Sequence, residues 1–189
     1  MKLYLVRHGE SQTNLEHRFT GQADAPLSEQ GKEDARKAGE KLKGLHFDRV
    51  YSSDLCRAAD TARIALECEP IQLEVLRELD VGSLAWRTVK ECEAEYGDEL
   101  WKNRNTYNYK PYGGENEEEL QKRARDFLTM LENDPCEQVI AFSHAGFITC
   151  TLTQVLGATF DRKHIKCLNA SIAVFEYRDG RWILEQWGL

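Results

Sequence analysis

The chain has 189 residues, of which 41% are hydrophobic and 30% charged, and 32 acidic residues outnumber 25 basic ones. A chain of this length is typical of one domain with a substantial buried core. The formal net charge of −7 argues against nucleic acid or an anionic membrane surface as a partner, because both are negatively charged. An anionic small molecule would therefore need a local cluster of positive groups to hold it.

Targeting and membrane signals are also missing from the sequence pattern. No stretch approaches the roughly 18 consecutive apolar residues of a membrane helix. The opening residues meet a charge at Arg7, which is too early for a signal peptide. The six cysteines include no CxxC pair, so neither a disulfide framework nor a zinc site is expected. We expect a cytoplasmic protein without a bound metal.

In the first half of the chain, short apolar runs alternate with helical periodicity. Residues 3–6, 49–52 and 71–76 have the composition of strands. Two helices are expected between them, with Ser28 and Asp54 as their N-cap residues, because short polar side chains can accept from the first free N–H groups of a helix.

The second half continues the same alternation after a less regular segment. Short helices are expected at about 88–96 and 98–104, and Asn116 with Glu119 fits a capping box before a longer helix. Residues 139–142 form the clearest buried strand, followed by another helix. The C-terminal residues 172–187, interrupted by Asp-Gly, predict a hairpin. Strands alternating with helices predict an α/β fold with a mostly parallel sheet and an antiparallel edge.

Charged side chains and histidines follow the apolar runs at the points where strands would end. In sheets of this kind, ligands bind at the carboxyl ends of the strands. The segments that follow the four runs are Arg7-His8-Gly9, residues 54–57, Arg77-Glu78 and residues 143–146. Two histidines, three arginines and a glutamate are therefore expected to converge on one rim of the sheet.

This combination of side chains suits phosphoryl transfer. A neutral imidazole at His8 is a good nucleophile toward phosphorus. Arg7 and Arg57 offer planar charged groups for the phosphoryl oxygens, and His144 would assist them, best as imidazolium. Glu78 remains to protonate the leaving oxygen and then to deprotonate water.

Each of these residues has an ordinary structural explanation when taken alone, and only their coincidence at strand ends favours a site. A metal site formed by His8, His144 and Glu78 is conceivable, but the neighbouring arginines would repel a cation. We therefore expect no metal and no cofactor.

The same segments carry a family resemblance that spans the chain in order. They are residues 5–11 (LVRHGES), residues 18–31 (RFTGQADAPLSEQG), residues 51–62 (YSSDLCRAADTA), Leu76-Arg77-Glu78, Gly113-Gly114-Glu115, Ser143-His144-Ala145-Gly146 and Asn169-Ala170-Ser171-Ile172. Together they resemble the signature of the histidine phosphatase superfamily, in its phosphoglycerate mutase-like branch. Residues 83–87 depart from the acidic-Gly pair that phosphatases of this family usually carry there.

The resemblance implies a three-layer α/β/α fold with helices on both faces of the sheet. We expect a single domain over residues 1–189, with a small cap insertion at about 77–115. The implied catalytic residues are the five already named, with His8 as the residue that becomes phosphorylated. The expected substrate contacts are Asn14, Thr20, Gly21, Gln22, Ala145 and Gly146.

The cap has to separate a phosphatase from a mutase, since both use this catalytic core. Mutases of the family are longer, carry Gly-Asn after the second histidine and have paired arginines in the cap, whereas this chain has Ala145-Gly146 and only the scattered Lys102, Arg104 and Lys110. Its cap is rich in aromatic residues. Those expected on the leaving-group side are Trp101, Tyr107, Tyr109 and Tyr112.

These features favour a hydrolase acting on a small phosphate ester with a neutral or ring-containing leaving group. An alpha-ribazole phosphate or a sugar phosphate would fit. Phosphoglycerate mutase-type transfer is the alternative. A non-catalytic phospholigand-binding module is a further one, although such a module would normally lack one of the catalytic groups. The oligomeric state stays open.

Overall fold

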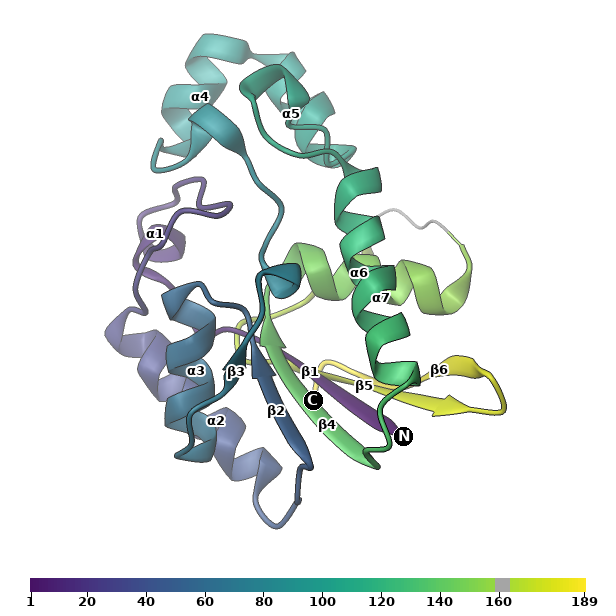
Figure 1. Cartoon of the computed structure of the whole chain (residues 1–189). Coiled ribbons are helices and arrows are strands. Elements are labelled where there is room, and N and C mark those ends of the chain that lie inside the picture. Colours follow the sequence, from purple (N-terminus) through teal and green to yellow (C-terminus); the bar gives the residue numbers. More distant parts are fainter. Residues whose placement is uncertain (159–163) are drawn as a thin grey trace.

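The computed structural model describes residues 1–158 and 164–189. Within them, six strands form one sheet in the order β3-β2-β4-β1-β5-β6 (Figure 1). The strands are β1 (Lys2–Arg7), β2 (Arg49–Ser52), β3 (Ile71–Gln72), β4 (Gln138–Ser143), β5 (Ile172–Arg178) and β6 (Arg181–Trp187). Strands β1 to β4 pair with one another in parallel, and β5 and β6 form the antiparallel edge. This confirms the predicted α/β class.

Helices cover both faces of the sheet. Alternate residues of β1 point to opposite sides, as strand geometry requires. Val6 packs with Ala38 and Ala62 of α2 (Glu29–Leu42) and α3 (Cys56–Leu66). Leu3 and Leu5 belong to a second cluster that includes α6 (Glu117–Glu132) and α7 (Ala145–Leu156). The result is the three-layer arrangement that the resemblance implied (Figure 1).

The segment between β3 and α6 forms the cap above the carboxyl ends of the strands (Figure 1). It contains α4 (Val89–Tyr96) and α5 (Asp98–Asn105), close to the predicted bounds, and the 3₁₀ turns η1 (Glu74–Leu76), η2 (Gly82–Leu84) and η3 (Lys110–Tyr112). Leu84, Cys92 and Leu100 belong to the same hydrophobic cluster as Leu3 and Leu5. The cap is therefore anchored to the sheet by shared core packing.

Two predicted helix starts are confirmed by their hydrogen bonds. The Ser28 hydroxyl accepts from the Gly31 N–H at 3.0 Å. Asn116 and Glu119 form a reciprocal capping box, with both bonds between 2.9 and 3.0 Å. Each satisfies N–H groups that a helix end leaves without an internal partner.

Two other local predictions were wrong. The N-cap residue of α3 is Leu55, which makes no side-chain capping hydrogen bond. Asp54 does not cap this helix, because the Asp54 carboxylate instead forms an ion pair with Arg77. The third strand ends at Gln72 rather than at residue 76, and the chain then turns through η1. The segment that carries Glu78 therefore leaves the sheet early, with consequences for how it is held.

The remaining short helix, α1 (Gln12–Leu15), begins at Ser11 with its own capping box and precedes the loop that faces the cap. Among the residues that the structure describes, we find no helix with the length and apolar character that crossing a membrane requires.

Candidate active site

The register of β1 and β4 brings the two histidines together. Arg7 pairs with Ser143 at the ends of these parallel strands, and the His8 N–H donates to the Ser143 carbonyl at 3.0 Å. The ring centroids of His8 and His144 consequently lie 5.1 Å apart, with the rings tilted by 60°. His8 is 4% exposed and His144 is fully buried. The predicted convergence of these two residues is confirmed.

Hydrogen bonding fixes the tautomer of His8. Its Nδ1 lies 2.6 Å from the Gly9 carbonyl oxygen, which can only accept, so Nδ1 carries the proton. The other ring nitrogen, Nε2, keeps its lone pair and receives a 3.3 Å contact from Nε of Arg57. Burial, followed by the charges of Arg57 and Arg7, lowers the pKa of His8 well below its usual value. The imidazole is therefore held neutral, with its lone pair on Nε2.

Arg57 is the most buried cation beside this nitrogen. It lies at the start of α3 with 1% of its surface exposed. Its two terminal nitrogens donate to the carbonyls of Gly21 and Ala23, each at 2.8 Å. Burial lowers its pKa to about 10, which still leaves a full positive charge at neutral pH. The same side chain thus contacts His8 and anchors the loop at residues 20–23.

Arg7 and His144 contain the unpaired polar atoms of this region. Arg7 donates through Nη1 to the Cys167 carbonyl at 2.6 Å. In the described part of the chain, buried Nε of Arg7 and both ring nitrogens of His144 have no hydrogen-bond partner. A buried polar atom without a partner is costly, so these atoms are suited to binding an anion that enters beside His8.

The protonation state expected for His144 is not the one that its surroundings favour. Burial and the nearby charge of Arg57 lower its pKa well below the usual value, so the neutral ring is preferred. This differs from the imidazolium form that the sequence predicts. The reason is that the sequence does not reveal complete burial beside another cation, which penalises the charged form.

Glu78 is held at both carboxylate oxygens. Oε1 accepts from the Leu79 N–H at 2.9 Å, and Oε2 accepts from the Gly146 N–H at 3.2 Å. Gly146 lies in the first turn of α7, where backbone N–H groups have no partner within the helix. Glu78 lines the same pocket as His8, so a carboxylate and a nucleophilic nitrogen face one cavity.

That cavity has a volume of about 200 Å³ and opens between the strand ends and the cap. Of the predicted substrate contacts, five line it: Asn14, Thr20, Gly21, Ala145 and Gly146. Gln22 does not. Its amide donates to the Glu78 carbonyl and to the Glu115 carboxylate, so this side chain is committed to contacts outside the cavity.

The cap contributes only part of the predicted aromatic set. Tyr107 and Tyr109 line the cavity. Trp101 does not, and its indole N–H donates to Glu93 at 3.1 Å. Tyr112 is turned into the core, where its hydroxyl accepts from Asn103 at 3.3 Å. The aromatic content of the cap thus serves packing as much as the cavity.

Five lining residues were missed as site residues: Arg18, Phe19, Leu79, Val81 and Arg104. The guanidinium of Arg104 lies over the rings of Phe19 and Trp101, at 5.5 and 5.2 Å from their centroids. Arg18 donates to Glu16 and to the Trp86 carbonyl. A signal existed for Arg18-Phe19, since the pair directly precedes the predicted contact Thr20. No local pattern distinguished Arg104 from its neighbours.

Two other cations were considered for the cap. Lys110 forms an ion pair with Glu119 at 2.6 Å, and neither Lys110 nor Lys102 lines the cavity. Arg77 also lies apart from it, paired with Asp54. Within residues 1–158 and 164–189, no cluster of three or more metal-binding side chains occurs.

Comparison with known proteins places these observations in a family. The family model described as histidine phosphatase superfamily (branch 1) matches residues 3–189. A protein named as a probable phosphoglycerate mutase from Salmonella paratyphi A is 32% identical, with 99% of this chain and 90% of that protein covered.

Solved structures agree over nearly the whole chain. A mycobacterial glucosyl-3-phosphoglycerate phosphatase has a TM-score of 0.87 at 26% identity, covering 99% of this chain and 98% of that one. A candidate alpha-ribazole-5′-phosphate phosphatase from Escherichia coli K-12 has a TM-score of 0.89 at 26% identity, covering 100% and 96%. The relatives thus include proteins named as phosphatases and as mutases, and this chain belongs to branch 1 of the histidine phosphatase superfamily.

Proposed function

We propose that this protein is a metal-independent phosphatase that hydrolyses a small phosphate monoester through a phosphohistidine intermediate on His8. The observation that carries the proposal is the state of His8: neutral, with Nδ1 committed to the Gly9 carbonyl and Nε2 available beside Arg57. Nucleophilic attack on phosphorus requires this form of the ring.

In the first step, Nε2 of His8 forms a bond to phosphorus as the ester oxygen leaves. Glu78 donates its proton to that oxygen, which matters most when the leaving group is an alkoxide. Arg7 and Arg57 balance the charge on the phosphoryl oxygens. His144 has two unpaired ring nitrogens beside the nucleophile, so it can add a hydrogen bond to the same group.

In the second step, water attacks the phosphohistidine. The Glu78 carboxylate, now deprotonated, accepts the proton of the water, the nitrogen–phosphorus bond breaks and inorganic phosphate leaves. The starting protonation states of His8 and Glu78 are thereby restored. One carboxylate thus acts as acid and then as base.

The cavity wall suggests the chemical class of the leaving group. Tyr107 and Tyr109 offer aromatic surface, whereas Arg18 and Arg104 add two cations that a neutral leaving group would not need. We therefore favour a compact phosphate ester whose leaving group has both a nonpolar part and a polar or anionic part. Sugar phosphates and phosphorylated hydroxy acids belong to this class, and an alpha-ribazole phosphate remains a candidate.

Phosphoglycerate mutase activity is the second candidate. Arg18 and Arg104 favour it, since a mutase must hold a second anionic group, and so does the relative named as a probable mutase. Against it stands Ala145-Gly146, where mutases of the family have Gly-Asn.

The deciding experiment is a metal-free turnover screen over phosphate esters, with mutase turnover and phosphate release measured on the same phosphoglycerate. Phosphate release that exceeds mutase turnover supports the phosphatase. Dominant mutase turnover would replace it with the second candidate. Phosphate binding without any turnover would leave a phospholigand-binding module.

A further inference from the structure

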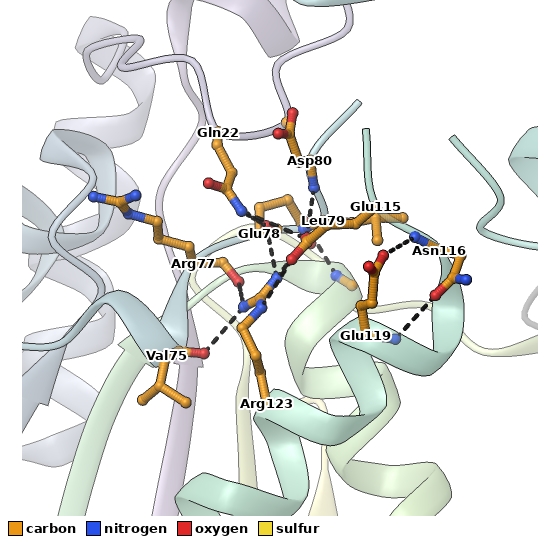
Figure 2. Close-up of polar contacts among 12 residues, drawn as sticks. Gln22, Val75, Arg77, Glu78, Leu79, Asp80, Glu115, Asn116, Glu119 and Arg123 are labelled. Atoms are coloured by element: carbon orange, nitrogen blue, oxygen red, sulfur yellow. Dashed lines mark hydrogen bonds and ion pairs between the residues drawn. The ribbon is translucent and has the colours of Figure 1, made fainter. Parts of the chain in front are cut away.

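Around the backbone of Glu78 lies a network of polar side chains from α6, the cap and the loop that follows α1 (Figure 2). We propose that Arg123, together with its partner Glu115, is a positioning residue that fixes the general acid Glu78 for proton transfer. The inference rests on the proposed role of Glu78 and concerns residues that do not line the cavity.

The segment that carries Glu78 needs such support because it lies outside the sheet. β3 ends at Gln72, so the following residues have no strand neighbour to pair with their carbonyl groups. Where the chain leaves a sheet, backbone carbonyl groups that are shielded from water need hydrogen-bond donors from other parts of the protein. The position of Glu78 is therefore set by whatever supplies those donors.

Arg123 supplies most of them. Its Nη1 donates to the carbonyls of Val75 at 3.0 Å and Arg77 at 2.6 Å, and its Nη2 donates to the Glu78 carbonyl at 3.1 Å (Figure 2). The two remaining N–H groups donate to both carboxylate oxygens of Glu115, at 3.2 and 2.8 Å. All five N–H groups of the guanidinium are thus engaged, in the planar fork that lysine cannot reproduce.

Glu115 extends the network to both sides of the acid. Its Oε2 also accepts from the Asp80 N–H at 2.9 Å, and its own N–H donates to the Asp80 carbonyl at 2.9 Å. Gln22 joins from the substrate loop, donating to the Glu78 carbonyl at 3.1 Å. The backbone is therefore held on both sides of Glu78, while the Leu79 and Gly146 N–H groups hold the carboxylate.

Arg123 and Glu115 are largely shielded from solvent, as expected for side chains that hold the backbone in one position. The side chains of Arg123 and Glu115 are 18% and 22% exposed. Neither of them lines the cavity, so neither can contact substrate directly. The contacts of this pair with the Arg77, Glu78 and Asp80 backbone give them a route to the chemistry through the placement of Glu78.

The test compares four single variants and one double variant on phenyl phosphate and p-nitrophenyl phosphate, which differ in how much the leaving oxygen needs a proton. Arg123→Lys should lower kcat for phenyl phosphate by about 10-fold or more, since a small misplacement of a catalytic group is costly. It should lower kcat for p-nitrophenyl phosphate by less than about 3-fold, because that leaving group needs little protonation. Inhibition by inorganic phosphate should be unchanged, because the groups around His8 are intact.

Glu115→Gln should have the same effect as Arg123→Lys, which is a larger loss of kcat for phenyl phosphate than for p-nitrophenyl phosphate. It provides the test if the Arg123→Lys variant does not fold. Arg125→Lys is the matched control, because Arg125 is exposed on the same helix and its guanidinium donates to Gln154 rather than to the segment that carries Glu78. It should leave both rates within about 2-fold.

Glu78→Gln, alone and combined with Arg123→Lys, separates the possible failures. If Arg123 acts through Glu78, the double variant should be no slower on phenyl phosphate than Glu78→Gln alone. Equal losses on both substrates, or losses that multiply in the double variant, would overturn the positioning role while leaving Glu78 as the acid. If Glu78→Gln itself shows no leaving-group dependence, the proposed acid is wrong and the inference falls with it.

Discussion

Gly146→Ala should displace Glu78, the proposed general acid, without disturbing His8. A Cβ atom at this position would lie 2.3 Å from Oε1 of Glu78, where ordinary contact begins at 3.4 Å. The carboxylate oxygen must therefore move by about 1.1 Å, since the new methyl group is fixed to α7. Leu120 is the next neighbour at 3.4 Å and need not move.

The expected effect on rate follows from that displacement. A misplacement of about 1 Å can cost roughly 10²-fold in rate, which corresponds to about 2.7 kcal/mol of barrier. We expect this loss for an alkyl phosphate and a much smaller loss for p-nitrophenyl phosphate, whose leaving group needs little protonation. Folding stability should change little, because alanine is preferred over glycine in a helix by about 1 kcal/mol and the displaced atom is the end of a flexible side chain.

The assay is steady-state turnover of both substrates, with thermal unfolding measured in parallel. The control is Gly146→Ala placed in a Glu78→Gln background, where no proton remains to be misplaced and the additional loss should vanish. An alkyl phosphate rate that stays within about threefold of the parent would refute this geometry of the acid. Equal slowing of both substrates would show that the substitution disturbs the phosphoryl site instead.

Three other outcomes are expected. Burial lowers the pKa of His8 and of His144, so below about pH 6.5 the unfolded chain binds more protons than the folded protein. The free energy of unfolding, measured with urea, should therefore decrease as the pH is lowered below this value, by up to about 1.4 kcal/mol per pH unit for each histidine. If His144→Asn left this pH dependence unchanged, the prediction would be wrong. Arg104→Ala should lower kcat/KM for a phosphate ester whose leaving group has a carboxylate, by a factor that corresponds to about 1.5–3 kcal/mol of activation free energy. Lys110→Ala removes an ion pair outside the cavity and should leave this kcat/KM unchanged. Equal effects of the two substitutions would rule out Arg104 as a substrate contact. EDTA should leave turnover within about twofold, because the arginines supply the positive charge, and a collapse restored by Mg²⁺ would disprove this.

Much of the fold could be predicted because its signals are local. The apolar runs at β1 and β4 and the capping box at Asn116 each depend on residues a few positions apart. The convergence of His8 and His144 followed from one additional rule, that parallel strands end at the same edge of a sheet. These inferences required no knowledge of long-range packing.

The failures share a different cause. Asp54 has the composition of an N-cap, but Arg77, 23 residues away, offers it a charged partner. Arg123 resembles any arginine on a helix surface, and only the backbone carbonyls that leave the sheet after Gln72 give it a role. Gln22 was assigned to the substrate from its motif, yet its amide faces the Glu78 carbonyl. In each case the deciding contact joins residues far apart in the chain, and such contacts have no signature in the local sequence.

The cap shows the same limit. Its aromatic content was visible, but the sequence did not reveal that Tyr107 and Tyr109 reach the cavity whereas Tyr112 does not. The position of Arg104 over the Phe19 ring joins two segments 85 residues apart in the chain. Such pairings arise from tertiary packing, which the local composition does not encode.

The covalent step on His8 is the central claim, and rapid-quench labelling tests it most directly. Brief incubation with a ³²P-labelled phosphate ester should give an acid-labile, alkali-stable adduct that maps to His8, because a P–N bond hydrolyses when its nitrogen is protonated. His8→Ala should abolish the adduct and lower turnover by at least ~10³-fold, whereas Arg125→Lys should retain both. Label on any other residue, or full activity in His8→Ala, would contradict the mechanism.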